Sequence, residues 1–324
     1  MKHVSDYVYL GSVLSEGGVS ESAELSVKRK VGRVKQLIFE IKAVVEDCRN
    51  DTPGALVTAV QIFEMSVIPY LYFASECWTD ISAGTLKILD QLQVLFYRVI
   101  LQAPVSCPIM GLYWMLAGSL PENRLMEKKL LFYYHLINLP GQTLGNKVIM
   151  EQRTLNLKGL ASECREFLAL LGINENLVFE CNKQSWRRTI QSRVKEKNKT
   201  DILEQIKRYK KLDFFQLRDE PFEIKPFFKT MNLKDCRTQF SLSTMTTRTI
   251  KTHFMSDKVF ASQLWECESC KLRDTIFHIK MCPNYEHLRE ANNYLQSDLN
   301  IVHYFQQVIK HRNDEIEKTR NECS

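Results

Sequence analysis

Three cysteines and one histidine near the C-terminal end have the types and the spacing of a zinc site. Cys267, Cys270, His278 and Cys282 follow the pattern C-x2-C-x7-H-x3-C. Three thiolates and one imidazole can close the tetrahedral coordination shell that structural Zn²⁺ prefers. His278 and Cys282 are about one helical turn apart and would therefore share a face. We predict one structural Zn²⁺ held by these four side chains.

Other residues leave the ligand set partly open. Cys236, His253 and His287 could each replace one ligand, although their spacing is less regular. A buried cysteine often serves only as a small hydrophobic residue, and one C-x2-C can arise by chance. A redox-active C-x-x-C is expected beside a βαβ pattern, and none is visible here. The metal site is the interpretation we favour.

The composition of the 324 residues is that of an ordinary globular protein. Hydrophobic residues make up 44% and charged residues 25%, which suits packed cores and argues against disorder. The length suggests two or three domains. The net charge of +6 favours an acidic partner. No apolar run is long enough for a membrane span, and no secretion signal is expected. The remaining cysteines are therefore expected to be reduced thiols in the nucleus or cytoplasm.

The hydrophobic spacing predicts a mainly α fold that begins with a short β-hairpin. Residues 7–14 are rich in β-branched and aromatic residues and precede Gly17-Gly18, which is typical of a strand or hairpin with a glycine turn. Apolar residues then recur at helical spacing to about residue 48. Four basic residues of this helix are expected to lie mostly off its apolar face: Arg29, Lys30, Arg33 and Lys35.

Further helices follow from periodicity and from proline positions. We predict a helix over 55–67 that breaks or kinks at Pro69, and an amphipathic helix over 86–99. Prolines punctuate two more helices that end near Leu139. Trp78 and Trp114 stand in apolar context and are expected in the core. Residues 233–245 and 298–312 predict a helix and a closing amphipathic helix.

A strongly basic helical segment runs from residue 183 to residue 211. Its thin apolar stripe contains Ile190, Val194, Ile202 and Ile206. A run of charged residues is usually a solvated helix face. This run is almost entirely positive, so a solvated face and a phosphate-binding face are about equally expected. Trp186 could stack on a base, and burial between helices is the more common role. The candidate phosphate contacts are Lys183, Arg187, Arg188, Arg193, Lys195, Lys197 and Lys199.

The order of motifs resembles the C-terminal part of non-LTR retrotransposon reverse transcriptases. Tyr9-Leu10-Gly11, with Gly17-Gly18, is similar to the strand pair that forms the primer grip in that family. The helix after it resembles the start of the thumb. Three later stretches resemble family motifs with substitutions in them: residues 68–78, residues 98–104 and residues 116–121. Trp265, the four predicted zinc ligands, Tyr285 and Arg289 are similar to the family's C-terminal zinc motif.

The resemblance implies polynucleotide binding without catalysis by this chain alone. A polymerase of this kind holds two magnesium ions with carboxylates that include an adjacent aspartate pair, and residues 1–324 contain no Asp-Asp dipeptide. The fingers and palm would lie upstream of Tyr9 and are not expected in this chain. Nothing after Cys282 matches the nuclease motif of some relatives. The alternatives are a helical protein-interaction scaffold and a subfragment of an active enzyme whose palm lies on upstream sequence.

Four segments are expected: a primer-grip-like hairpin at 1–20, a thumb-like helical bundle at 21–150, a basic helical connection at 151–225, and a zinc-finger domain at 226–324. The predicted partners are RNA or DNA, contacted mainly through phosphates. Neither a membrane nor a small-molecule substrate is expected. The oligomeric state stays open.

Overall fold

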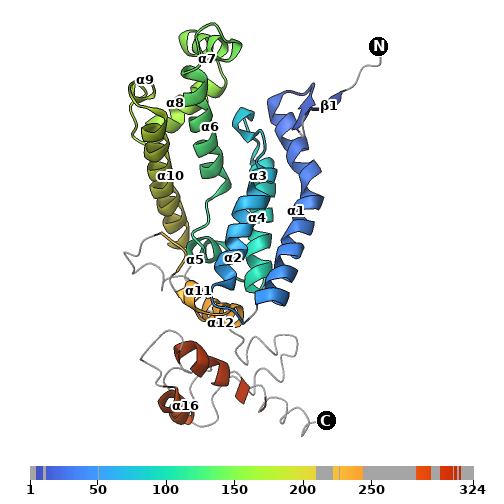
Figure 1. Cartoon of the computed structure of the whole chain (residues 1–324), viewed down its shortest axis with the longest axis vertical. Coiled ribbons are helices and arrows are strands. Elements are labelled where there is room, and N and C mark those ends of the chain that lie inside the picture. The colour runs from blue at the N-terminus through green and yellow to red at the C-terminus, as the bar shows by residue number, and fades with distance from the viewer. Residues whose placement is uncertain are drawn as a thin grey trace.

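The chain is described by a computed structural model over residues 5–9, 12–49, 51–208, 222–225, 227–243, 282–292, 300–308, 310–311 and 314. Across these residues it is mainly helical, with a two-stranded antiparallel hairpin at the N-terminal end. The predicted fold class is confirmed at this coarse level. Figure 1 shows long helices running side by side in two groups. No helix in the described ranges is long and apolar enough to cross a membrane.

The hairpin consists of β1 (Asp6–Tyr9) and β2 (Ser12–Ser15), paired in a register that sets Tyr7 opposite Leu14. Tyr7 and Leu14 are both exposed. The predicted hairpin is confirmed, but Gly17-Gly18 lies after its second strand and joins the hairpin to the first helix. Of the primer-grip-like residues, Tyr9 ends β1, while Leu10 and Gly11 lie outside the described residues.

Serine hydroxyl groups on the first helix, α1 (Val19–Arg49), form hydrogen bonds to the hairpin. The Val13 backbone N–H donates to Ser26 Oγ over 2.8 Å, and the Ser15 N–H donates to Ser22 Oγ over the same distance. Ser22 and Ser26 are buried. Each hydroxyl thus accepts a hydrogen bond from a strand N–H that is buried or partly buried, and such N–H groups need a partner.

The first group of helices contains α1, α2 (Ala55–Ile62), α3 (Ile68–Leu71) and α4 (Ala83–Leu101), with the short α5 (Ile109–Met115) at its end. The chain stays helical through the predicted break at Pro69, because a π-helical turn spans Phe63–Val67. There the Ile68 N–H bonds to the Phe63 carbonyl five residues back. The wider turn accommodates Pro69, which has no N–H to donate.

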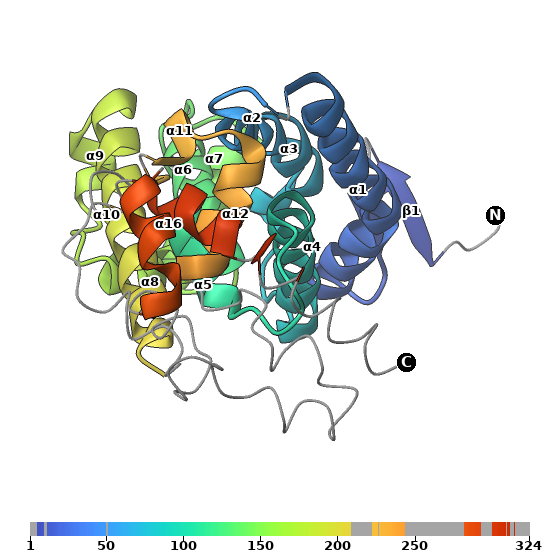
Figure 2. The ribbon, with the colours of Figure 1, turned by 90° about the horizontal axis from the view of Figure 1, so that it is seen from below.

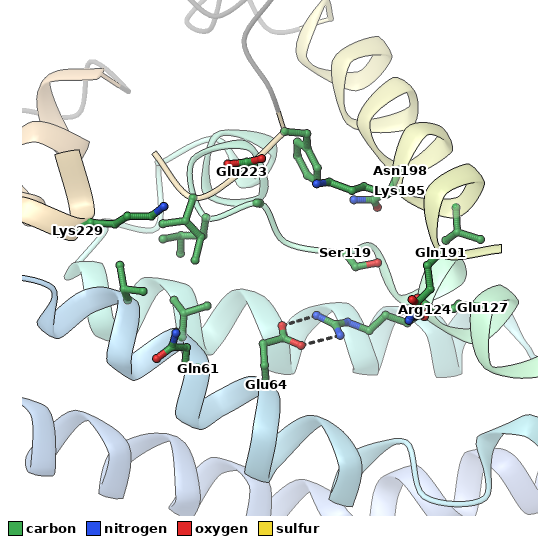
Figure 3. Close-up of a pocket in the computed structure, with 17 residues that line it drawn as sticks. Gln61, Glu64, Ser119, Arg124, Glu127, Gln191, Lys195, Asn198, Glu223 and Lys229 are labelled. Carbon is green, nitrogen blue, oxygen red and sulfur yellow. Dashed lines mark hydrogen bonds and ion pairs between the residues drawn. The ribbon is translucent and has the colours of Figure 1, made fainter. Parts of the chain in front are cut away.

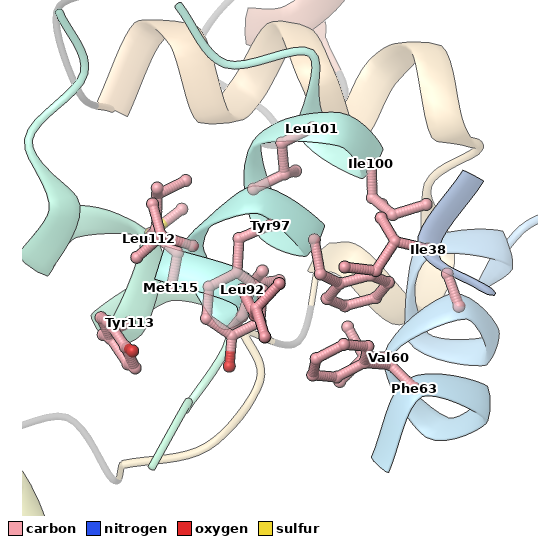
Figure 4. Close-up of a cluster of buried hydrophobic side chains, with 14 of the residues drawn as sticks. Ile38, Val60, Phe63, Leu92, Tyr97, Ile100, Leu101, Leu112, Tyr113 and Met115 are labelled. Atoms are coloured by element: carbon pink, nitrogen blue, oxygen red, sulfur yellow. The ribbon is translucent and has the colours of Figure 1, made fainter. Parts of the chain in front are cut away.

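Aromatic rings fill the core between these helices. Phe63 stacks on Phe96 with ring centroids 3.9 Å apart, and Tyr97 meets Tyr113 edge-on at 5.5 Å. The edge-on arrangement of the second pair is one of the geometries that aromatic pairs favour. Figure 4 shows side chains of α2, α4 and α5 converging on this cluster. Both tryptophans expected in the core are buried, Trp78 and Trp114.

Lys30 departs from the polar face expected of α1. Arg29, Arg33 and Lys35 are exposed as predicted, but Lys30 is only 4% exposed. The expectation was wrong for Lys30 because it stands between Val27 and Val34, at spacings of three and four residues, and so shares their buried row.

Backbone carbonyls and aromatic rings surround the buried ammonium group. Lys30 Nζ donates to the carbonyls of Leu71 and Phe73 over 3.4 and 3.3 Å. It also lies 5.7 Å from the ring centroids of Phe73 and Trp78. Carbonyls at a helix end need donors, and ring faces attract cations. Lys30 therefore supplies hydrogen-bond donors to the carbonyls at the C-terminal end of α3.

Burial gives Lys30 a testable pH dependence. Desolvation, helped by the nearby Lys128 and opposed by Glu76, lowers the pKa of Lys30 from 10.5 to about 8. Between pH 8 and 10.5 the unfolded chain therefore binds more protons at this group than the folded chain, so this group's contribution to stability rises with pH. We expect the free energy of unfolding of the wild type, minus that of Lys30→Met, to rise by about 1 kcal/mol per pH unit in this window. Urea unfolding at pH 7.5, 8.5 and 9.5 measures it, and a constant difference would contradict the assignment.

The second group of helices contains α6 (Pro121–Ile137), α7 (Leu144–Thr154), α8 (Leu160–Leu170), α9 (Leu177–Glu180) and α10 (Lys183–Ile206). The helix α6 contributes to the cores of both groups, with Leu125 in one and Leu130 in the other. The carboxylate of Glu163 on α8 joins them further, because it pairs with the buried Lys129 Nζ at 2.5 Å and accepts the Asp80 N–H at 2.7 Å. The predicted segment boundaries stay predictions.

Two short helices, α11 (Phe227–Thr230) and α12 (Leu233–Ser243), cross one end of the first group. Figure 2 shows them from that end. The structure confirms the helix predicted at 233–245. Residues 300–308 are helical and bury Val302, Phe305 and Val308, as the predicted closing helix requires. Gln306 Nε2 donates to Asp235 Oδ1 over 2.8 Å, which attaches this helix to α12.

Candidate nucleic-acid interface

Residues 183–206 of the basic segment form one helix, α10, with a defined start. The Asn182 side chain accepts the Ser185 N–H over 2.9 Å and caps the first turn. The buried residues of α10 are spaced four apart along one row: Trp186, Ile190, Val194, Asn198, Ile202 and Ile206. The predicted apolar stripe is confirmed, and this row holds α10 against α6 and α5.

Trp186 is a core residue. Its side chain is 1% exposed, its Nε1 donates to the Leu130 carbonyl over 3.1 Å, and its ring stacks on Tyr134 with centroids 5.5 Å apart. Since both ring faces lie inside the protein, Trp186 does not offer a surface for a base. The interpretation that it is buried between helices is confirmed.

Asn198 is a polar residue within the buried row that the sequence did not single out. Its Oδ1 accepts the Leu120 N–H over 2.9 Å and Asn123 Nδ2 over 3.1 Å, and its Nδ2 donates to the Gly118 carbonyl over 3.0 Å. The amide thus satisfies backbone groups of the link between α5 and α6. These hydrogen bonds fix the position of α10 along its axis relative to that link.

The seven predicted phosphate contacts differ in exposure. Lys197 Nζ is held by Asp201 at 2.8 Å, and Lys197 and Lys199 are half-buried. The other five side chains are exposed, and within the described part of the chain none of them forms an ion pair: Lys183, Arg187, Arg188, Arg193 and Lys195. These five are available to an external anion.

Helical geometry gathers four of the cations into a stripe. Lys183, Arg187, Lys195 and Lys199 are separated by multiples of four residues, with Gln191 at the position between Arg187 and Lys195. Each step of four residues advances about 6 Å along the helix axis and turns about 40° around it, so these residues form a continuous row that winds slowly around the helix. We call this row, from Lys183 to Lys199, the basic stripe. The remaining cations of α10 lie on its other sides.

The basic stripe runs past a pocket of about 520 Å³. Figure 3 shows its walls, which come from α2, from the link between α5 and α6, from α10 and from residues 222–224. Gln191 and Lys195 belong to both the stripe and the pocket lining, and Lys229 lies at the opposite side.

An ion pair forms one side of the pocket. Arg124 on α6 makes two hydrogen bonds to the Glu64 carboxylate, which projects from the π-helical turn. Burial of Arg124 favours its neutral form, but Glu64 and the nearby tyrosines outweigh this effect and raise the pKa of Arg124 above its ordinary value, so the guanidinium stays charged. No local pattern indicates this pair, because its partners are 60 residues apart in the chain.

The predicted zinc ligands fall mostly outside the described residues. Cys267, Cys270 and His278 lie there, as does the alternative ligand His253. Among the described residues no group of three or more His, Cys, Asp or Glu side chains could hold a metal ion. The zinc site therefore stays a prediction.

The fourth predicted ligand, Cys282, is held in a fixed backbone geometry. Its side chain is buried, and its carbonyl accepts hydrogen bonds from the Tyr285 N–H over 3.2 Å and from Arg289 Nη1 over 2.8 Å. These bonds give Tyr285 and Arg289 of the family-like motif a structural role. Tyr285 packs with Tyr304 and Phe305 of the closing helix in a small hydrophobic core that is separate from the cores of the two helix groups.

The alternative ligand Cys236 is poorly suited to a metal. It lies in the buried face of α12, its Sγ donates to the Met231 carbonyl over 3.7 Å, and burial raises the pKa of the thiol to about 12. A metal ligand must be the thiolate. His287 is exposed on α16 (Glu286–Ala291).

Comparison of the chain with protein-family models, with curated proteins and with solved structures gives no match.

Proposed function

We propose that this chain binds polynucleotides through phosphate contacts made by α10, as the C-terminal part of a reverse transcriptase of the non-LTR retrotransposon type would. The observation that carries the proposal is the basic stripe: a row of cations, three of them exposed, on a helix whose neighbouring row is buried in the core. Because the helix backbone is already ordered, binding a row of phosphates has to order only the side chains of these cations. Thumb-like and primer-grip-like roles for the helical bundle and the hairpin belong to the same proposal.

Phosphate contacts carry no direct information about base sequence. We therefore expect the chain to bind unrelated RNA and DNA sequences of equal length with affinities within about a factor of ten. Fluorescence anisotropy with a structured RNA, a random duplex and a homopolymer tests this. Tight binding of one sequence and no binding of the others would contradict the phosphate-based proposal.

The proposal includes no catalysis by this chain. No primer extension is expected with dNTPs and magnesium, because positioning two metal ions for phosphoryl transfer requires a carboxylate set and residues 1–324 lack an adjacent aspartate pair. Extension by the purified chain would overturn this part.

The zinc site is expected to fold the C-terminal segment. We expect one Zn²⁺ per reduced chain, and its loss in Cys270→Ser, because the free energy of binding is free energy of folding in such small sites. The control is Cys77→Ser, which changes an exposed cysteine outside the motif. Metal analysis measures the stoichiometry, and circular dichroism should show that the helices of residues 19–206 persist. Retention of a full equivalent of zinc by Cys270→Ser would refute the ligand set.

A second candidate function is a protein-interaction scaffold. The observation that favours it is the exposure of Leu144 and Val148 on α7 and of Leu155 directly after that helix. A scaffold would bind a protein partner with weak dependence on salt, whereas phosphate binding depends steeply on it.

A further inference from the structure

We propose that the pocket between α2 and α10 receives one unstacked nucleotide from a single strand bound along the basic stripe. This inference rests on the proposed function and deepens it by naming the form of nucleic acid that the site prefers.

The position of the pocket beside the basic stripe supports this proposal. A strand whose phosphates follow Lys183, Arg187 and Lys195 must pass Gln191, and Gln191 and Lys195 line the pocket mouth. A base that turns away from solvent at this point faces the pocket. A single strand can present such a base, whereas a duplex must first unpair and unstack it.

The lining suits a nucleobase. The walls offer apolar groups, including Val57, Val194 and Ile224, and neutral polar groups at Gln61 and Ser119. A base has two flat apolar faces and an edge of hydrogen-bond donors and acceptors, so walls of this mixed kind match it. A volume of about 520 Å³ lies within the usual range of small-molecule pockets.

The charges of the lining favour a base with flanking phosphates over a free nucleoside triphosphate. Arg124 and Glu64 neutralise each other, and the Glu127 carboxylate accepts Gln191 Nε2 over 3.0 Å. Glu223 is exposed and opposes anions at the mouth. Lys195 and Lys229 remain as exposed amines on two different elements, where phosphodiesters on either side of the base would lie.

The test blocks the pocket with a bulky side chain and leaves the residues of the basic stripe unchanged. Gln61 is exposed on α2, so Gln61→Trp should place an indole in the pocket while the chain still folds. The matched control is Met65→Trp, which adds the same ring at a position that is 79% exposed and does not line the pocket. Anisotropy compares a single-stranded oligonucleotide with the duplex of the same sequence. A 2-aminopurine in the single strand reports unstacking on binding.

We expect Gln61→Trp to lower the affinity for the single strand by about tenfold or more, as the loss of one base contact would. The affinity of Gln61→Trp for the duplex should change less than twofold. The affinities of Met65→Trp for the single strand and for the duplex should also change less than twofold. The rise in 2-aminopurine fluorescence seen with the wild type should disappear in Gln61→Trp. If Gln61→Trp does not fold, Lys229→Ala replaces it and should weaken single-strand binding more than duplex binding.

The outcomes separate this inference from the proposed function. Unchanged single-strand affinity in Gln61→Trp, or an equal loss for single strand and duplex, overturns the pocket proposal and leaves binding by α10 in place. A wild-type chain that binds neither nucleic acid overturns both.

Discussion

Reversing three charges on the basic stripe should lower the affinity for RNA and DNA by about 10²-fold at 0.15 M salt. The variant is Lys183→Glu, Arg187→Glu and Lys195→Glu, all at exposed positions of α10. Each lost phosphate contact removes a factor of roughly five at this salt concentration, from the dependence of binding on released counterions. The buried row of α10 is untouched, so the fold should persist.

A matched variant separates the stripe from the overall charge. Arg29→Glu, Lys35→Glu and Lys87→Glu reverse exposed cations on α1 and α4 and bring the net charge from +6 to 0, as the stripe variant does. The matched variant should lose less than tenfold in affinity. An equal loss in both variants would mean that the protein attracts nucleic acid only through its overall charge, and would contradict a localised interface.

Replacing Trp186 with alanine should destabilise the folded chain by about 3–5 kcal/mol, the range for a large aromatic residue removed from a core. The ring is 1% exposed and lies between α10 and α6, stacked on Tyr134. Its removal leaves a cavity at the first turn of α10. The basic stripe begins on that turn, so nucleic-acid affinity should fall together with stability.

Trp186→Phe is the control, because it keeps an aromatic ring on Tyr134 and loses the N–H that reaches the Leu130 carbonyl. We expect it to cost about 1 kcal/mol for the hydrogen bond, together with a smaller cavity. Urea unfolding followed by circular dichroism measures both variants. A Trp186→Ala variant as stable as the wild type would show that α10 is held by other contacts.

The helical elements could be predicted from the sequence because their signals are local. Periodicity located α1, α4 and the closing helix, and Pro108 and Pro121 marked the starts of α5 and α6. The burial of Trp78 and Trp114 followed from their apolar neighbours in sequence. The row of Lys183, Arg187, Lys195 and Lys199 was also present in the sequence as four-residue spacing, but it becomes one continuous row on the surface only because residues 183–206 form one helix.

Lys30 and Asn198 show why the rest could not be predicted. Each stands in an apolar row at helical spacing, so its position predicted burial while its chemistry predicted exposure. The groups that decide the outcome are distant in sequence: the Lys30 amine meets carbonyls 41 and 43 residues away, and the Asn198 amide meets backbone groups 78 and 80 residues away. The pocket has the same origin, since its walls come from separate parts of the chain that meet only in the fold.

The salt dependence of binding tests the central claim most directly. The logarithm of the affinity falls linearly with the logarithm of salt concentration, with a slope of roughly −0.9 for each phosphate contacted on duplex DNA. Titration from 0.05 to 0.3 M salt should give a slope for the stripe variant that is shallower than the wild-type slope by about 3, and a wild-type slope for the matched variant. Equal slopes in the wild type and the stripe variant would show that Lys183, Arg187 and Lys195 contact no phosphates, and would contradict the assignment of α10 as the nucleic-acid interface.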